Sequence, residues 1–256
     1  KMHSVLAYFA FLFALFGTAL TTDYCDPSLC PNKTNIACNN DGQFASTCVE
    51  PQEVVFTQQQ KDAITNLHNE KRNKVAGGKS FLNAACRMAT IQWDDELAYM
   101  ATLNVKQCEI QDDECRNTDA FKHSGQNIGW MNYYSNPNIT NMAERAIDLW
   151  FNEIMDTDQT YIDKYPRNLQ GPVIGHFTVM VVDRNIRLGC AAATYLPTGE
   201  NYYGFLFTCN YATTNVVNYP VYKSCTKGGA ECKTGRNPDY PYLCSTSEEY
   251  NVNKFH

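Results

Sequence analysis

The sequence lacks the short motifs that mark common catalytic sites. It has no nucleophile elbow (G-x-S-x-G), no zinc-protease helix (H-E-x-x-H), no P-loop and no dinucleotide fingerprint (G-x-G-x-x-G). It also lacks a basic excess, because 21 Lys and Arg stand against 27 Asp and Glu, with no block of like charge. Nucleic acid and anionic membranes are therefore poor candidates for partners.

Long apolar runs are absent except at the start of the chain. Residues 5–16 are almost entirely apolar, follow a short basic leader at residues 1–3, and give way to small residues up to Ala19. This order predicts a secretory signal peptide over residues 1–19. The run is too short for a membrane helix, which needs about 20 apolar residues. We expect a secreted, extracellular protein without stable membrane insertion.

Cysteine is abundant. An even count behind a signal peptide predicts up to six disulfides, whose connectivity the spacing leaves open. Cys25 and Cys30, with four residues between them, are the most closely spaced pair, and no second such pair with a histidine completes a structural zinc site. The cysteines are therefore predicted to serve architecture rather than catalysis. Sequons at Asn32 and Asn138 predict surface glycosylation sites. The twelve cysteines are residues 25, 30, 38, 48, 86, 108, 115, 190, 209, 225, 232 and 244.

Three helices are predicted in the first two thirds of the chain. Thr57 and Gln60 form a capping box at the start of the first, which the glycine pair at residues 77–78 ends. A second helix begins near Asp94. A third begins near Asn141, its apolar residues recurring at helical spacing as far as residue 154.

Three strands are predicted after the helices, at residues 176–182, 187–196 and 202–211. They are rich in β-branched and apolar residues, and short turn sequences separate them, so an antiparallel arrangement is favoured. Cys190 and Cys209 lie on the last two and could face one another across a hairpin. Helices followed by strands indicate an α+β fold in which helices pack on a sheet.

Four segments in this order resemble the CAP superfamily, which includes the cysteine-rich secretory proteins, insect antigen 5 and plant pathogenesis-related 1 proteins. They read LHNEKR at residues 67–72, HSGQNIGW at 123–130, GHFTVMV at 175–181 and FTCNY at 207–211. The cysteine-rich start and the ending near Pro220 are most similar to the antigen 5-related proteins of fly saliva and body fluid. The resemblance covers residues 56–222, between an N-terminal extension (20–55) and a disulfide-tied tail (223–256).

The resemblance implies an α-β-α sandwich with an antiparallel central sheet and a groove that holds two histidines and two acidic residues. Carried over residue by residue, it gives His68, Glu153 on the third helix, and His176. The fourth position is Gln126, where many members have Glu. Glutamine cannot act as a general base and removes one negative charge from a cation site.

Two functions follow from this set of groove residues. Two imidazoles and a carboxylate could hold Zn²⁺ or another divalent cation, which would suit a metal-dependent hydrolase resembling a peptidase. These residues could instead have a structural role, in which they hydrogen-bond to one another across the groove and hold helix to strand. Because an acid is missing, we favour a monomeric, non-enzymatic binding protein that requires no cofactor. Its partner would be a small apolar ligand such as a lipid, or an extracellular defence or host protein.

Overall fold

The computed structural model describes residues 22–255, and the predicted signal peptide lies outside these residues. The helices are α1 (Gln58–Ala76), α2 (Asp95–Val105), α3 (Ile139–Asn152), α4 (Gln159–Asp163) and α5 (Gly175–Met180), with a 3-10 turn η1 (Glu153–Asp156) directly after α3. The strands are β1 (Gln52–Val54), β2 (Ala84–Ala85), β3 (Gln92–Trp93), β4 (Gly125–Tyr133), β5 (Arg187–Tyr195), β6 (Tyr203–Tyr211) and β7 (Ser224–Cys225).

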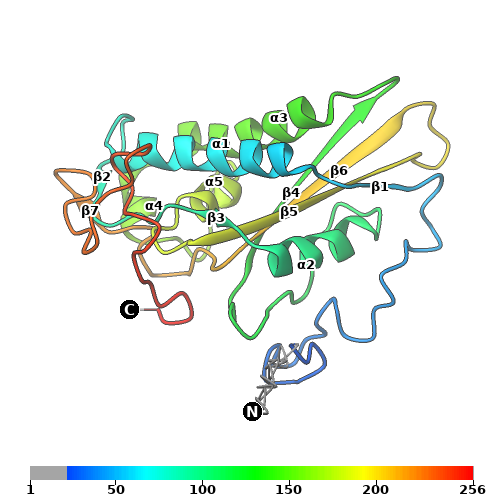
Figure 1. Ribbon diagram of the computed structural model, residues 1–256, viewed down its shortest axis with the longest axis horizontal. Coiled ribbons are helices and arrows are strands. Elements are labelled where there is room, and N and C mark those ends of the chain that lie inside the picture. The colour runs from blue at the N-terminus through cyan, green and yellow to red at the C-terminus, as the bar shows by residue number, and fades with distance from the viewer. Residues whose placement is uncertain (1–21, 256) are drawn as a thin grey trace, which may run out of the picture.

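A central sheet separates two helical layers (Figure 1). Its strands run in the order β1-β5-β6-β4, all antiparallel to their neighbours, and the short β3 joins β5 in parallel. Helices α1, α3 and α5 cover one face, and α2 covers the other. The predicted α+β class and the α-β-α sandwich are thus confirmed.

Local sequence signals explain where α1 begins and ends. The Thr57 side chain accepts from the Gln60 backbone N–H, and the Gln60 side chain accepts from the Thr57 N–H, as the capping box predicts. At the other end, the Gly77 N–H donates to the Asn73 carbonyl, and Gly78 takes a left-handed φ of 66°. This helix therefore has the same limits that its sequence indicates.

Each face of the sheet carries its own core. On the α1/α3 face, the ring of Trp150 stacks on Phe207 at 5.4 Å, and Phe207 stacks in turn on Phe205 at 6.1 Å. On the other face α2 approaches β5 so closely that a Cβ on Gly189 would lie 2.1 Å from the Ala98 nitrogen. Any larger residue at this position would push α2 off the sheet.

The prediction of a strand at residues 176–182 is wrong. Residues 175–180 form α5, and the strand that completes the sheet is β4, which the sequence pattern did not indicate. Tertiary partners complete the short helix, because Arg72 donates to the Met180 carbonyl at 2.7 Å and Asn185 donates to the Val179 carbonyl at 2.8 Å. These contacts override the strand preference of a β-branched run.

All twelve cysteines are paired. Cys190 and Cys209 are directly opposite one another in the β5–β6 register and form the predicted disulfide. Two disulfides, Cys30–Cys115 and Cys48–Cys108, tie the N-terminal extension to the segment after α2, and Cys86–Cys225 links the residue after β2 to β7 across 139 residues. Long loops gain the most from such crosslinks. The other two pairs are Cys25–Cys38 and Cys232–Cys244.

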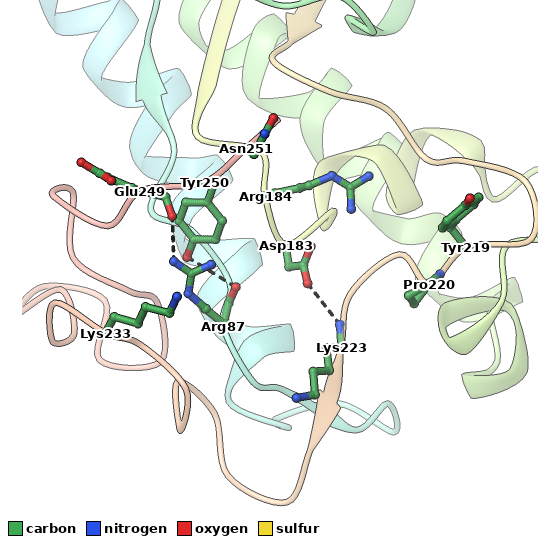
Figure 2. Close-up of a pocket in the computed structure, with 10 residues that line it drawn as sticks. All are labelled: Arg87, Asp183, Arg184, Tyr219, Pro220, Lys223, Lys233, Glu249, Tyr250 and Asn251. Atoms are coloured by element: carbon green, nitrogen blue, oxygen red, sulfur yellow. Dashed lines mark hydrogen bonds between the residues drawn. The ribbon is translucent and has the colours of Figure 1, made fainter. Parts of the chain in front are cut away.

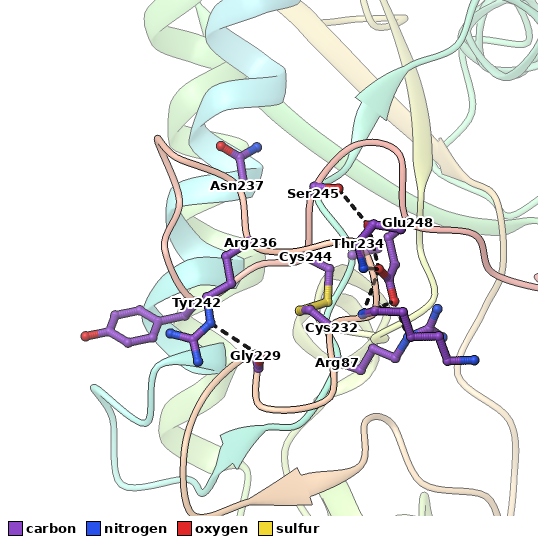
Figure 3. Close-up of a disulfide and its surroundings, with 12 residues drawn as sticks. Arg87, Gly229, Cys232, Thr234, Arg236, Asn237, Tyr242, Cys244, Ser245 and Glu248 are labelled. Carbon is purple, nitrogen blue, oxygen red and sulfur yellow. Dashed lines mark hydrogen bonds and ion pairs between the residues drawn. A yellow bond between two sulfur atoms is a disulfide. The ribbon is translucent and has the colours of Figure 1, made fainter.

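The C-terminal tail is organised by a buried carboxylate beside the Cys232–Cys244 disulfide (Figure 3). Glu248 accepts from the backbone N–H groups of Lys233 and Thr234, from the Thr234 hydroxyl, and from Arg87 at 2.5 Å. Burial opposes the charge of Glu248, but these hydrogen bonds outweigh it and lower its pKa to about 2. The tail is thereby fastened to the loop that carries Arg87.

Within residues 22–255, no helix has the length and apolar character that a membrane span requires.

Candidate functional site

Two of the predicted site residues meet at the surface. The His176 Nδ1 lies 2.5 Å from Glu153 Oε1, and Glu153 Oε2 accepts from the Phe177 backbone N–H at 3.0 Å. Glu153 is the first residue of η1 rather than part of the third helix, which ends at Asn152. The turn from α3 into η1 therefore aims the carboxylate at the first residues of α5.

The His176 ring is held on a second side by an aromatic platform. It stacks on Trp150 at a centroid distance of 6.3 Å and an angle of 13°, and the Trp150 indole nitrogen donates to the Ile128 carbonyl at 3.2 Å. The sequence pattern indicated Trp150 only as a core residue. Its indole joins α3 to β4 and also supports the imidazole.

The chemistry open to the His176–Glu153 pair follows from its hydrogen bond. A carboxylate can only accept, so Nδ1 carries a proton, and in the neutral form of the ring Nε2 holds the lone pair. The His176 side chain is 36% exposed, and Nε2 makes no hydrogen bond to any residue between 22 and 255. Such a nitrogen can accept a proton, receive a hydrogen bond from a partner or ligate a cation.

The structure does not bring His68 to this pair. The His68 side chain is fully buried; its Nδ1 donates to the Ile64 carbonyl at 2.8 Å, and its Nε2 accepts from the Tyr211 hydroxyl at 2.9 Å. Burial lowers the pKa of His68 to about 4. Asn127 links the two sites, since its amide donates to the Tyr211 oxygen at 3.3 Å and to the His176 carbonyl at 3.1 Å. His68 is therefore a neutral structural residue, and this chain of hydrogen bonds reaches only the backbone of His176.

The rest of the segment at residues 67–72 is structural as well. Asn69 exchanges two hydrogen bonds with the backbone of Ile91, each 2.9 Å long. Arg72 is fully buried and donates to the carbonyls of Ala89, Met180 and Val182. Because carbonyls accept these bonds, the buried charge needs no carboxylate partner. This segment binds α1 to the end of α5.

Gln126 points to the opposite face of the sheet. Its amide nitrogen donates to Asp113 Oδ2 at 2.7 Å and to Asn210 Oδ1 at 2.9 Å, and its oxygen accepts from the Asp113 backbone N–H at 3.0 Å. Neighbouring residues on a strand face opposite ways, and Asn127 contacts His176. Gln126 therefore cannot share a site with His176. Its amide fills a place beside Asp113 where a second carboxylate would be repelled.

The residues present do not fit a zinc site of three protein ligands. His176 and Glu153 supply two donors and bond to each other, whereas His68 and Gln126 are engaged elsewhere. Among residues 22–255, the one cluster of three such side chains is Cys86, Cys225 and Glu231, and its sulfur atoms form a disulfide. A bound divalent cation stays a prediction. The asparagines of both sequons are exposed, and Asn138 also caps α3, but glycosylation likewise stays a prediction.

An α-β-α sandwich with six disulfides and a surface His–Glu pair defines the class of protein, and comparisons with known proteins identify its family. The model of the cysteine-rich secretory protein family, CAP, matches residues 65–211, and the chain belongs to this family. It is 41% identical to venom allergen-1 of Aedes albopictus, over 93% of this chain and 94% of that protein. It is 39% identical to antigen 5 like allergen Cul n 1 of Culicoides nubeculosus, over 75% and 91% respectively.

Solved structures agree on the fold. The structure of NaASP2 with Zn²⁺ has a TM-score of 0.61 and 23% identity, and covers 74% of this chain and 96% of that one. BmVAL-1 has a TM-score of 0.59 and 18% identity, with coverage of 74% and 95%. The expected relationship to antigen 5 proteins of insects is confirmed by the sequence relatives, and the sandwich by these structures.

Proposed function

We propose that this chain is a secreted, non-enzymatic binding protein of the antigen 5 type. The observation that carries the proposal is that the four predicted groove residues do not come together in one site. His68 and Gln126 have their hydrogen-bonding groups engaged in holding the sandwich together, on opposite faces of its sheet. What faces solvent is one oriented imidazole on an aromatic platform, which suits recognition of a partner better than hydrolysis.

Exposed apolar side chains on the same elements support a binding role. Leu149 on α3 is 60% exposed, and Met155 on η1 is 75% exposed. They flank, in sequence, the Trp150 and Glu153 side chains that hold His176. The partner would be a small apolar ligand or an extracellular defence or host protein. The contacts of Trp150 and Glu153 hold the His176 ring in place, which lowers the entropy lost on binding.

The alternative is a hydrolase that uses the His176–Glu153 pair. The observation in its favour is the carboxylate on Nδ1, which leaves Nε2 free to accept a proton. Hydrolysis by this pair alone would need a nucleophile or a cation that the described neighbours of His176 do not supply.

One experiment separates the two functions. The secreted protein, its His176→Ala variant and a control, Arg145→Gln on the exposed part of α3, are assayed against peptide libraries with and without added zinc. We expect no turnover by any of them. Turnover by the wild type and the control that disappears in His176→Ala would establish the hydrolase and overturn the proposal.

Binding is tested by native mass spectrometry of the protein from its own tissue, which reports partner, metal, glycans and oligomeric state together. A co-purifying small molecule or protein that is lost in His176→Ala supports the proposal. Sequencing of the N-terminus of the same material tests secretion, for which we expect a chain that begins near residue 20.

A further inference from the structure

A cavity of about 530 Å³ lies between the C-terminal tail and the end of the sandwich, away from His176. Figure 2 shows side chains from four separate segments around it. Arg87 comes from the loop before β3, Arg184 from the turn after α5, Tyr219 from the segment after β6, and Tyr250 from the tail. The volume is that of a typical small-molecule site.

The cavity is cationic in a protein whose net charge is −6. Four basic side chains line it against two acidic ones, Asp183 and Glu249. Two of the four already have carboxylate partners outside the cavity, since Arg87 pairs with Glu248 and Lys223 pairs with Glu231, each at 2.5 Å. The other two are Arg184 and Lys233.

Of these two residues, Arg184 indicates what the cavity could bind, because its charge lacks a partner. It is only 9% exposed, and its Nε has no hydrogen-bond partner among residues 22–255. No carboxylate oxygen of the same residues lies within 4.0 Å of its guanidinium nitrogens, and its guanidinium carbon lies 5.1 Å from the centroid of the Phe255 ring. The neighbouring Asp183 carboxylate attracts this charge from beyond that distance but forms no ion pair with it, and it accepts a hydrogen bond from the Lys223 backbone N–H at 3.2 Å.

Buried polar atoms in native proteins are almost always bonded, and a buried cation is normally paired. Arg72 shows how the same fold satisfies a buried guanidinium, with three carbonyls within 2.9 Å. The guanidinium of Arg184 has no such arrangement, although it lines a cavity in which an anion would complete its contacts. In Figure 2 it extends across the space between Asn251 and Tyr219.

The rest of the lining suits an apolar body attached to that anion. Tyr219, Pro220 and Tyr250 contribute ring surface. Tyr250 is held in place by Arg87, whose guanidinium lies 4.3 Å from its ring centroid. An aromatic and aliphatic wall beside one unpaired guanidinium matches a ligand with a single acidic head and a hydrocarbon body.

We propose that this cavity binds a small amphipathic organic anion, a carboxylate or sulfonate on an aromatic or branched body, with Arg184 as the residue that recognises the charge. The site is separate from the His176–Glu153 pair, and the proposal stands whether that pair binds or catalyses. A free acid and an acidic group on a larger lipid share this chemistry, and the cavity volume favours the free acid.

The test uses two probes of matched shape, anilinonaphthalene sulfonate and its uncharged analogue phenylnaphthylamine, with the full secreted chain. Fluorescence titration and calorimetry give affinity and stoichiometry for the wild type, Arg184→Gln, Arg184→Lys and the exposed control Arg145→Gln. Circular dichroism and thermal unfolding establish that each variant is folded.

We expect one molecule of the sulfonate per chain, bound about tenfold more weakly by Arg184→Gln, as for the loss of a charge-assisted hydrogen bond. Arg184→Lys should keep part of the affinity, and Arg145→Gln all of it. The uncharged analogue should bind all four proteins equally. Equal sulfonate affinity in the wild type and Arg184→Gln, or no saturable binding to the wild type, would overturn the proposal.

Discussion

The substitution Gln126→Glu tests the interpretation that this position holds a structural amide. The substitution preserves shape but changes one donor into an acceptor. The Gln126 nitrogen now donates to Asp113 Oδ2 at 2.7 Å, and Asp113 also accepts from Asn104 at 2.7 Å. Burial already raises the pKa of Asp113, against the hydrogen bonds of Asn104 and Gln126. A second carboxylate in contact with it cannot ionise without strong repulsion.

The cost can be worked out from the proton that the variant must take up. If the introduced carboxyl group is protonated so that it donates to Asp113, the penalty at pH 7 is about 4 kcal/mol, since the ordinary pKa of a glutamate is about 4.3 and each pH unit contributes about 1.36 kcal/mol. The lost bond to Asn210 adds about 1 kcal/mol at any pH. The total of about 5 kcal/mol at pH 7 is an upper limit, because rotation of the side chain to solvent would relieve the repulsion.

The pH dependence distinguishes this mechanism from simple loss of packing. A raised carboxyl pKa in the folded state means that the variant regains stability as pH falls, so we expect a deficit of about 3 kcal/mol at pH 5.5. Guanidinium unfolding, followed by tryptophan fluorescence with disulfides intact, measures both values. The matched control is Gln59→Glu at an exposed position in the first turn of α1, which should be neutral or slightly stabilising. A Gln126→Glu variant as stable as the wild type, or one with the same deficit at both pH values, refutes the reasoning.

Two further predictions concern buried titratable groups. Burial holds the pKa of His68 at about 4, below its ordinary value, so its contribution to stability is present above about pH 6.5 and lost as pH falls towards 4. We expect a loss of about 3 kcal/mol from this group and an imidazole that NMR finds neutral at pH 5.5; a protonated ring at that pH would contradict the buried network. For the tail, Glu248→Gln should cost about 2 kcal/mol at pH 7 because it removes the Arg87 ion pair, whereas the exposed Glu249→Gln should cost nothing. The carboxyl pKa of Glu248 is lowered, so the difference between these two variants should shrink as pH falls from about 5 to 2; a constant difference argues against the charge.

Much of the architecture is encoded in short-range signals. The capping box at Thr57 and the glycine pair after Ala76 act within one turn of helix, so their sequence pattern is sufficient to place α1. Strands β5 and β6 are mostly apolar and are buried along almost their whole length because both faces of the sheet are covered. The opposition of Cys190 and Cys209 follows from the register of these two strands.

The elements around the site were harder to predict. The run at residues 176–182 has strand composition but forms α5, since its carbonyls find donors on α1 and on the following turn. In β4, glycine and polar residues are interspersed with half-buried apolar ones without regular alternation, so the strand has a weak sequence pattern. It forms because β6 pairs with it along its whole length. The surroundings of a site residue on such an element cannot be predicted before its partners are known.

Sequence by itself determined the family, the three longer helices, the Cys190–Cys209 pair and the placement of Glu153 and His176 in one site, because ordered motifs and local periodicity carry that information. Only the tertiary structure decided which polar residues share a face. Adjacent residues on β4 point to opposite sides of the sheet, so Gln126 meets Asp113, while Asn127 reaches His176. Burial then decided the rest: it left His68 as a neutral member of the core and Arg184 as an unpaired cation beside a cavity, and neither environment can be read from neighbours in the chain.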